Sequence, residues 1–210
     1  MNGGTINLQP LKGGNELSLH LNLYNKQKIS KFPLGDRGMN SDLFKNITTF
    51  IFDVDGVLTD GTVLVLENGL QARRMSIRDG YALQLAVKKD YRVLIVSGAA
   101  ASPVIDRLNK LGIKDVHMGV TDKRLFVETF ILNNKLTAAE IIFMGDDLPD
   151  LPGMSVVGLP ACPADAATEI REISKYISPV NGGCGCVRDV IEKVLKLRGD
   201  WQHTEDIVSR

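Results

Sequence analysis

The sequence predicts an α/β protein with a doubly wound parallel sheet, and three observations lead to this fold class. Apolar, β-branched runs recur along the chain, separated by amphipathic stretches of helical length. Polar residues stand where several of these runs end, as Asp53 does after 47–52 and Ser97 does after 92–96. Hydrophobic residues make up 44% and charged residues 24% of the chain, which are ordinary values for a globular domain.

The first expected element is a buried strand over 47–52. Two strand-like runs, 62–66 and 71–77, then flank Asn68-Gly69, and Asn-Gly between such runs is a strong hairpin signal. The connection after the first core strand is therefore expected to be a β-hairpin insertion without a separate cap domain. The remaining strands are expected at 92–96, 116–118, 141–144, 156–159 and 176–177. Helices are expected at 79–89 (capped by Asp79), 102–111, 123–133, 165–174 and 187–197, with a capping box at Thr137–Glu140.

The first 40 residues differ in composition from the rest. They are rich in Gly, Asn and Lys and have no sustained periodicity, and Met39 directly precedes the core. We expect residues 1–40 to be a flexible or dispensable extension, or upstream sequence before a true start at Met39. Residues 41–210 are expected to form one α/β domain with a C-terminal tail.

Charge and cysteine content exclude several classes of function. The chain has 25 basic and 25 acidic residues, so nothing in its charge indicates a nucleic-acid partner. No apolar run approaches the roughly 20 residues that span a bilayer, and no secretory signal is evident. Three cysteines, an odd number, favour reduced thiols in a cytoplasm, and the spacing of Cys184 and Cys186 does not fit common zinc sites.

Residues 53–61, DVDGVLTDG, carry the most informative motif. In an open α/β sheet, ligands bind beyond the carboxyl ends of the strands, which is where Asp53 and Asp55 are expected. Two carboxylates this close need a divalent cation to offset their repulsion. We expect Mg²⁺ bound by Asp53, Asp146 and the backbone carbonyl of Asp55. Asp53 would attack phosphorus, and Asp55 would protonate the leaving alcohol and then deprotonate water.

Later motifs fit the same chemistry. Ser97 and Gly98 would donate hydrogen bonds to a phosphate, and Lys123 would supply positive charge. Residues 145–150, GDDLPD, would add Asp147 and Asp150 as acids that support the metal and its waters. For Asp150, a role as a helix cap is an equal alternative.

These four motifs resemble those of the haloacid dehalogenase (HAD) superfamily phosphatases. The short hairpin, residues 78–81 (RDGY) and residues 182–188 (GGCGCVR) further resemble the 3-deoxy-D-manno-octulosonate 8-phosphate (KDO 8-phosphate) phosphatase family. The resemblance covers about 43–197. It implies a capless HAD fold, a Mg²⁺ requirement, a role in lipopolysaccharide biosynthesis, and a homotetramer whose subunits cover one another's active sites. It also implies that the tail folds over the substrate.

Specificity is expected to lie at the far end of the substrate. Arg78 and Arg74, near the hairpin's return, are candidates for a substrate carboxylate, with Arg78 preferred, and Arg188 of the tail is a third. Four successive apolar residues, 63–66, are too many for one buried face of a hairpin, which indicates subunit packing.

The sequence leaves other functions open. A nine-carbon ketoacid 9-phosphate, of the sialic-acid type, would present the same phosphate and carboxylate as KDO 8-phosphate. A phospho-receiver domain also uses Asp, Ser/Thr and Lys, but its acidic pair precedes a separate accepting Asp, unlike the order here. A non-catalytic interaction domain is the third possibility.

Overall fold

The computed structural model describes residues 42–100 and 103–202. The expected extension over 1–40 and the end of the tail lie outside the described residues. Ser102, where a helix was expected to begin, lies outside them as well. Among the described residues, no helix combines the length and the apolar character needed to cross a membrane.

A six-stranded sheet forms the centre of the domain, and every neighbouring pair of its strands is parallel. The strand order is β5-β4-β1-β6-β7-β8, so the chain builds outward from β1 first on one side and then on the other. This reversal beside β1 makes its carboxyl end the expected ligand site of a doubly wound sheet. The strands are β1 (Thr49–Phe52), β4 (Arg92–Val96), β5 (Asp115–His117), β6 (Ile141–Met144), β7 (Leu159–Cys162) and β8 (Tyr176–Ile177).

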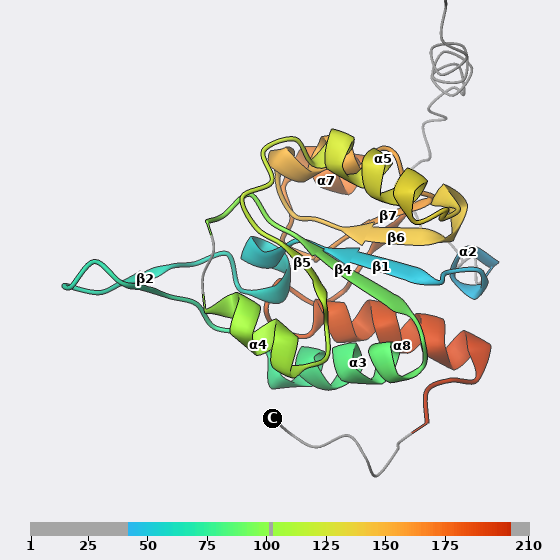
Figure 1. The fold of residues 1–210 in the computed structure, drawn as a ribbon, viewed down its shortest axis with the longest axis horizontal. Coiled ribbons are helices and arrows are strands. Elements are labelled where there is room, and N and C mark those ends of the chain that lie inside the picture. Colours follow the sequence, from blue (N-terminus) through green and yellow to red (C-terminus); the bar gives the residue numbers. More distant parts are fainter. Residues whose placement is uncertain (1–41, 101–102, 203–210) are drawn as a thin grey trace, which may run out of the picture. The chain divides into compact units, whose positions relative to one another are not determined.

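Helices cover both faces of the sheet (Figure 1). One face carries α3 (Ile77–Lys88), α4 (Val104–Lys110) and α8 (Cys186–Arg198), and the other carries α5 (Lys123–Asn133) and α7 (Thr168–Ile173). Short helical elements are α2 (Asp42–Lys45), α6 (Leu151–Met154), η1 (Val54–Leu58), η2 (Ala138–Glu140) and η3 (Leu148–Asp150). The predicted doubly wound α/β fold is confirmed.

The residues of β1 divide between two cores. All four are buried, and Phe50 and Phe52 pack with α3 and α8, whereas Ile51 packs with α5 on the opposite face. This alternation follows from the period of two along a strand. Burial on both faces explains why the strand reads as a continuous apolar run.

The insertion after β1 is a two-stranded hairpin of β2 (Leu64–Val65) and β3 (Gln71–Ala72). It extends away from the sheet in Figure 1. Gly69, with φ +80°, makes the tight turn that Asn68-Gly69 predicted. Leu64 and Val65 are 63% and 69% exposed, so the apolar hairpin does not pack on its own domain.

Three local predictions are corrected. Helix α3 begins at Ile77 and is capped by Ser76, whose Oγ accepts a hydrogen bond from the amide of Asp79 at 3.3 Å. Asp79 lies inside the first turn of α3, and Oδ1 of its carboxylate instead accepts from the amide of Arg188, 2.7 Å away, at the start of α8. The strand expected at 156–159 lies at β7, 159–162, and Thr137 makes no capping hydrogen bond.

Candidate active site

The loop after β1 presents the two aspartates of the first motif. The amide of Asp53 donates to the carbonyl of Met144 on β6 at 3.1 Å, which continues the sheet by one residue and fixes Asp53 at its edge. At Asp55 and Gly56 the backbone leaves helical geometry, with φ +83° at Gly56. The Thr59 hydroxyl closes the turn: it accepts from the Gly56 amide at 3.3 Å and donates to the Val54 carbonyl at 3.2 Å.

A buried ion network joins three motifs beside this loop. The ammonium of Lys123, at the start of α5, lies 2.8 Å from Oδ1 of Asp53 and 2.5 Å from Oδ1 of Asp150. The Lys123 side chain is only 4% exposed. The ammonium is therefore held directly beside the proposed nucleophile, where an incoming phosphate would meet both groups.

The loop after β6 is organised by Asp150. Its Oδ2 accepts from the amides of Asp146, at 3.0 Å, and Asp147, at 3.5 Å, while the Asp147 carboxylate accepts from the amide of Leu148 at 2.8 Å. This reciprocal arrangement is a capping box for η3. Both oxygens of Asp150 are thus already engaged, so it shapes the loop and orients Lys123, which leaves the carboxylate of Asp146 to bind a ligand.

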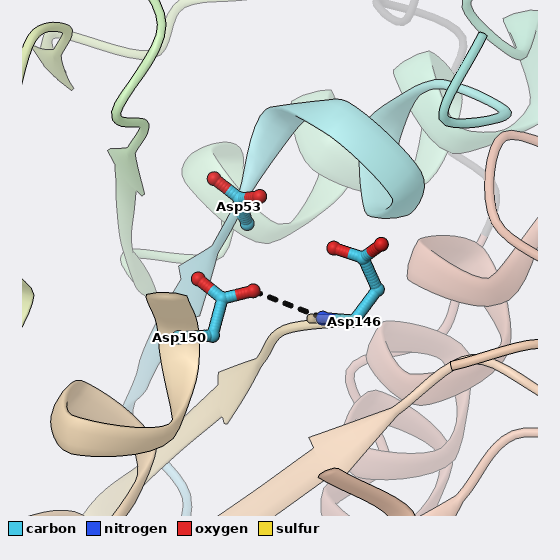
Figure 2. Close-up of side chains that lie close together, drawn as sticks. All are labelled: Asp53, Asp146 and Asp150. Atoms are coloured by element: carbon cyan, nitrogen blue, oxygen red, sulfur yellow. Dashed lines mark hydrogen bonds between the residues drawn. The ribbon is translucent and has the colours of Figure 1, made fainter. Parts of the chain in front are cut away.

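Asp53, Asp146 and Asp150 form an acidic cluster (Figure 2). One carboxylate oxygen from each lies within 4.8 Å of those of the other two. Burial, reinforced by repulsion from Asp150, raises the pKa of Asp53 to about 7 and that of Asp146 to about 7. A Cβ on Gly56 would fall 1.9 Å from Oδ2 of Asp146, so only glycine lets the two loops approach this closely.

The donor set of this cluster fits a hard divalent cation. Carboxylate and carbonyl oxygens are the ligands that Mg²⁺ prefers, and acids with raised pKa values gain most from an added positive charge. Asp53 and Asp146 have oxygens available for it, and the carbonyl of Asp55 lies on the same loop as Asp53.

Ser97, Gly98 and Lys123 lie in the same cavity as the acids, and its volume is about 660 Å³. Ser97 follows β4 and is 1% exposed, and its Oγ accepts from the amide of Ala99 at 3.1 Å. The carbonyl of Ser97 accepts from the Val120 amide at 3.0 Å, which joins this loop to the one before α5. The structure therefore brings together all the predicted catalytic, metal-binding and supporting residues: Asp53, Asp55, Ser97, Gly98, Lys123, Asp146, Asp147 and Asp150.

Arg78 and Arg188 do not line this cavity. They line a second cleft, together with Cys184 and Lys193. The Arg188 guanidinium pairs with Glu192 at 3.0 Å and lies 5.3 Å from the ring centre of Trp201. Within one chain, none of the three arginines expected to bind a substrate carboxylate, Arg74 included, lines the cavity that holds the catalytic acids.

The glycine-rich tail packs against the nucleophile loop of its own chain. The amide of Gly183 donates to the Val57 carbonyl at 2.9 Å, and the amide of Gly182 donates to Oδ1 of Asp165 at 2.9 Å. A Cβ on Gly182 would lie 2.0 Å from the Gly56 carbonyl oxygen. Among the described residues this segment therefore supports the nucleophile loop of its own chain, and the expectation that the tail folds over a substrate stays a prediction.

Sequence reasoning missed one residue at the site. Nε of Arg73, just after β3, lies 2.6 Å from Oδ1 of Asp55. The two residues are 18 positions apart, and they meet because the hairpin returns to the loop it left.

The fold and the four motifs at one sheet edge define a protein of the HAD phosphatase class. No family model matches the chain. It is 34% identical over 155 residues to the 3-deoxy-D-manno-octulosonate 8-phosphate phosphatase KdsC of Escherichia coli K12, covering 74% of this chain and 82% of that protein. KdsC of Yersinia pestis is 34% identical over 158 residues, covering 73% of this chain and 84% of the relative.

Solved structures agree with these relatives. The 3-deoxy-D-manno-octulosonate 8-phosphate phosphatase of Moraxella catarrhalis, in complex with a magnesium ion, a phosphate ion and KDO, matches with a TM-score of 0.75 and 29% identity. The match covers 78% of this chain and 95% of that one. The chain belongs to the KDO 8-phosphate phosphatase family.

Proposed function

We propose that this chain is a Mg²⁺-dependent phosphatase that converts KDO 8-phosphate to KDO and inorganic phosphate through a phosphoaspartate on Asp53. One observation carries the proposal: Asp53 and Asp55, two residues apart at the carboxyl end of β1, face Asp146 and Lys123 in one cavity. Membership of the KdsC family and the Mg²⁺, phosphate and KDO bound by the Moraxella relative support the substrate and the cation.

In the first step, a carboxylate oxygen of Asp53 bonds to phosphorus as the bond from phosphorus to the sugar oxygen breaks. The Asp55 carboxyl gives its proton to the departing alkoxide. In the second step, Asp55 takes a proton from water, the water oxygen bonds to phosphorus, and the bond to Asp53 breaks. Asp55 returns to its starting state, so atoms and protons balance over the two steps.

Groups that are already in place stabilise the negative charge of the phosphate. Lys123 is fixed by two carboxylates and is available to the phosphate oxygens without reorganisation. Bound between Asp53, Asp146 and the Asp55 carbonyl, Mg²⁺ would supply further positive charge and align the phosphate with the nucleophile. Ser97 and the amides around Gly98 complete the phosphate contacts. Asp147 and Asp150 hold the loop that carries Asp146.

Binding of the substrate carboxylate requires a second copy of the chain. Among the described residues, Lys123 is the one cation lining the cavity, against several aspartates, so the substrate carboxylate lacks a partner there. Arg78 and Arg188 of a neighbouring copy would provide one. The exposed apolar hairpin supports assembly, and we extend the proposal to a homotetramer.

We further propose that the protein acts in the cytoplasm, in lipopolysaccharide biosynthesis. The three cysteines form no disulfide, which is usual for that compartment.

The test is phosphate release from a panel of KDO 8-phosphate, a nine-carbon ketoacid 9-phosphate and neutral hexose phosphates, each with Mg²⁺ or with EDTA. The highest kcat/KM is expected for KDO 8-phosphate with Mg²⁺. A preference for the nine-carbon substrate would reassign the substrate, and no Mg²⁺-dependent release from any of them would refute the phosphatase.

A further inference from the structure

The side chain of Asp55 is held in a different way from the other acids of the site. Lys123 fixes both Asp53 and Asp150, two backbone amides also donate to Asp150, and both acids are almost fully buried. The Asp55 side chain is 36% exposed. Within the part of the chain that the structure describes, its carboxylate has a single hydrogen-bond partner, Nε of Arg73 at 2.6 Å.

Arg73 is half-buried, although the two residues before it are exposed. Its side chain is 13% exposed, whereas Gln71 and Ala72 lie open to solvent. Two residues later, Met75 pairs with Thr59 in an antiparallel bridge. This bridge ties the hairpin's return to the loop that carries Asp55, so the position of Arg73 is set by the hairpin.

Proton transfer in both steps requires an Asp55 carboxyl that is accurately placed. The same group must reach the leaving oxygen in the first step and water in the second, and proton transfer requires hydrogen-bond distance in both. Arg73 engages Oδ1, which leaves Oδ2 for the proton. Arginine suits this role because its planar, rigid guanidinium fixes the orientation of the bound carboxylate as well as pairing with its charge.

We propose that Arg73 is a positioning residue that orients Asp55 for proton transfer, and that the hairpin thereby contributes directly to catalysis. The inference rests on the proposed phosphatase function. It predicts a defect confined to steps in which Asp55 moves a proton, with binding of substrate and Mg²⁺ retained.

The experiment compares R73Q, R73K and the control R92Q on KDO 8-phosphate and on p-nitrophenyl phosphate. Arg92 begins β4, at the opposite end of that strand from Ser97, and its guanidinium also donates a side-chain hydrogen bond, to Asn134 at 2.5 Å. R73Q should lower kcat on KDO 8-phosphate by about tenfold to a hundredfold, with KM within about threefold, and R73K should recover part of the loss. R92Q should stay within about twofold of the wild type.

The aryl substrate separates positioning from a general structural defect. Because p-nitrophenolate leaves without a proton, its release in a single turnover should change by less than about threefold in R73Q. In a D55N background, R73Q should cost little further activity.

Each outcome bears on one claim. Wild-type protein inactive on both substrates would refute the proposed function itself. If the wild type is active, three results would overturn the role of Arg73 alone. The first is a kcat of R73Q equal to that of R92Q, and the second is an equal loss of R73Q in single turnovers of both substrates. The third is a loss of activity from R73Q that adds in full to the loss from D55N.

Discussion

Substituting Gly182 by Ala tests whether the tail holds the catalytic loop in place. The added Cβ would lie 2.0 Å from the carbonyl oxygen of Gly56 and 3.2 Å from that of Thr59. Both contacts are with backbone, so no side-chain rotation relieves them, and either the tail or the loop must move. Overpacking of this kind costs about 1–3 kcal/mol. A loss of about 2 kcal/mol corresponds to a Tm decrease of roughly 4–8 °C for a domain of this size.

The same shift should impair turnover, because Gly56 directly follows Asp55. A displacement on the order of 1 Å in a catalytic group can cost about a hundredfold in rate. We therefore expect kcat for phosphate release in Gly182→Ala to fall by about tenfold to a hundredfold, measured together with Tm by calorimetry.

Gly199→Ala is the matched control. Gly199 ends α8 with φ +77°, and no atom lies within 4 Å of its Cβ position. The strained backbone should cost about 1–2 kcal/mol of stability without affecting kcat. If Gly182→Ala lowered Tm but kept kcat within about twofold of wild type, the tail would stabilise the domain without setting the catalytic loop.

Further predictions concern the acids, the cation and the extension. Asp53→Asn should abolish phosphate release, whereas Asp55→Asn should slow both chemical steps but keep the Mg²⁺-induced rise in Tm. Activity should be lost with EDTA and inhibited by Ca²⁺, which prefers more ligands at longer distances, and full turnover after metal removal would contradict this. The pKa values of about 7 for Asp53 and Asp146 mean that the metal-free fold is stabilised by protonation at low pH and loses that stability as pH rises to 7. Because Mg²⁺ binds the ionised acids, it should raise Tm more at pH 8 than at pH 6, and calorimetry showing the reverse would refute the assignment. Removal of residues 1–38 should leave Tm and kcat nearly unchanged, and a halved activity would show that the segment matters.

Strand ends were the part of the site that the sequence could predict. Once β1, β4 and β6 are recognised as parallel, Asp53, Ser97 and Asp146 must meet at one edge of the sheet, whatever the details of packing. The hairpin was predictable for a similar reason, because Asn68-Gly69 specifies a local turn.

Contacts that depend on three-dimensional detail were not predictable. Arg73 reaches Asp55 only through the path of the hairpin, which the sequence pattern does not specify. Asp79 has the residue type of a cap for its own helix, but tertiary structure assigns its carboxylate to α8. The apolar run 156–159 looked like a strand, whereas β7 runs over Leu159–Cys162 and contains Pro160, a residue that is rare inside strands.

The phosphoaspartate on Asp53 is the central claim, and trapping it is the most direct test. Enzyme mixed with KDO 8-phosphate labelled with ³²P is quenched in acid within one turnover, and the protein is digested and mapped by mass spectrometry. Asp55→Asn should accumulate more label than wild type if water attack is slowed more than phosphate transfer. We predict label on the peptide containing Asp53, absent from Asp53→Asn and released by hydroxylamine. Rapid phosphate release with no labelled protein, or label on another residue, would contradict the mechanism.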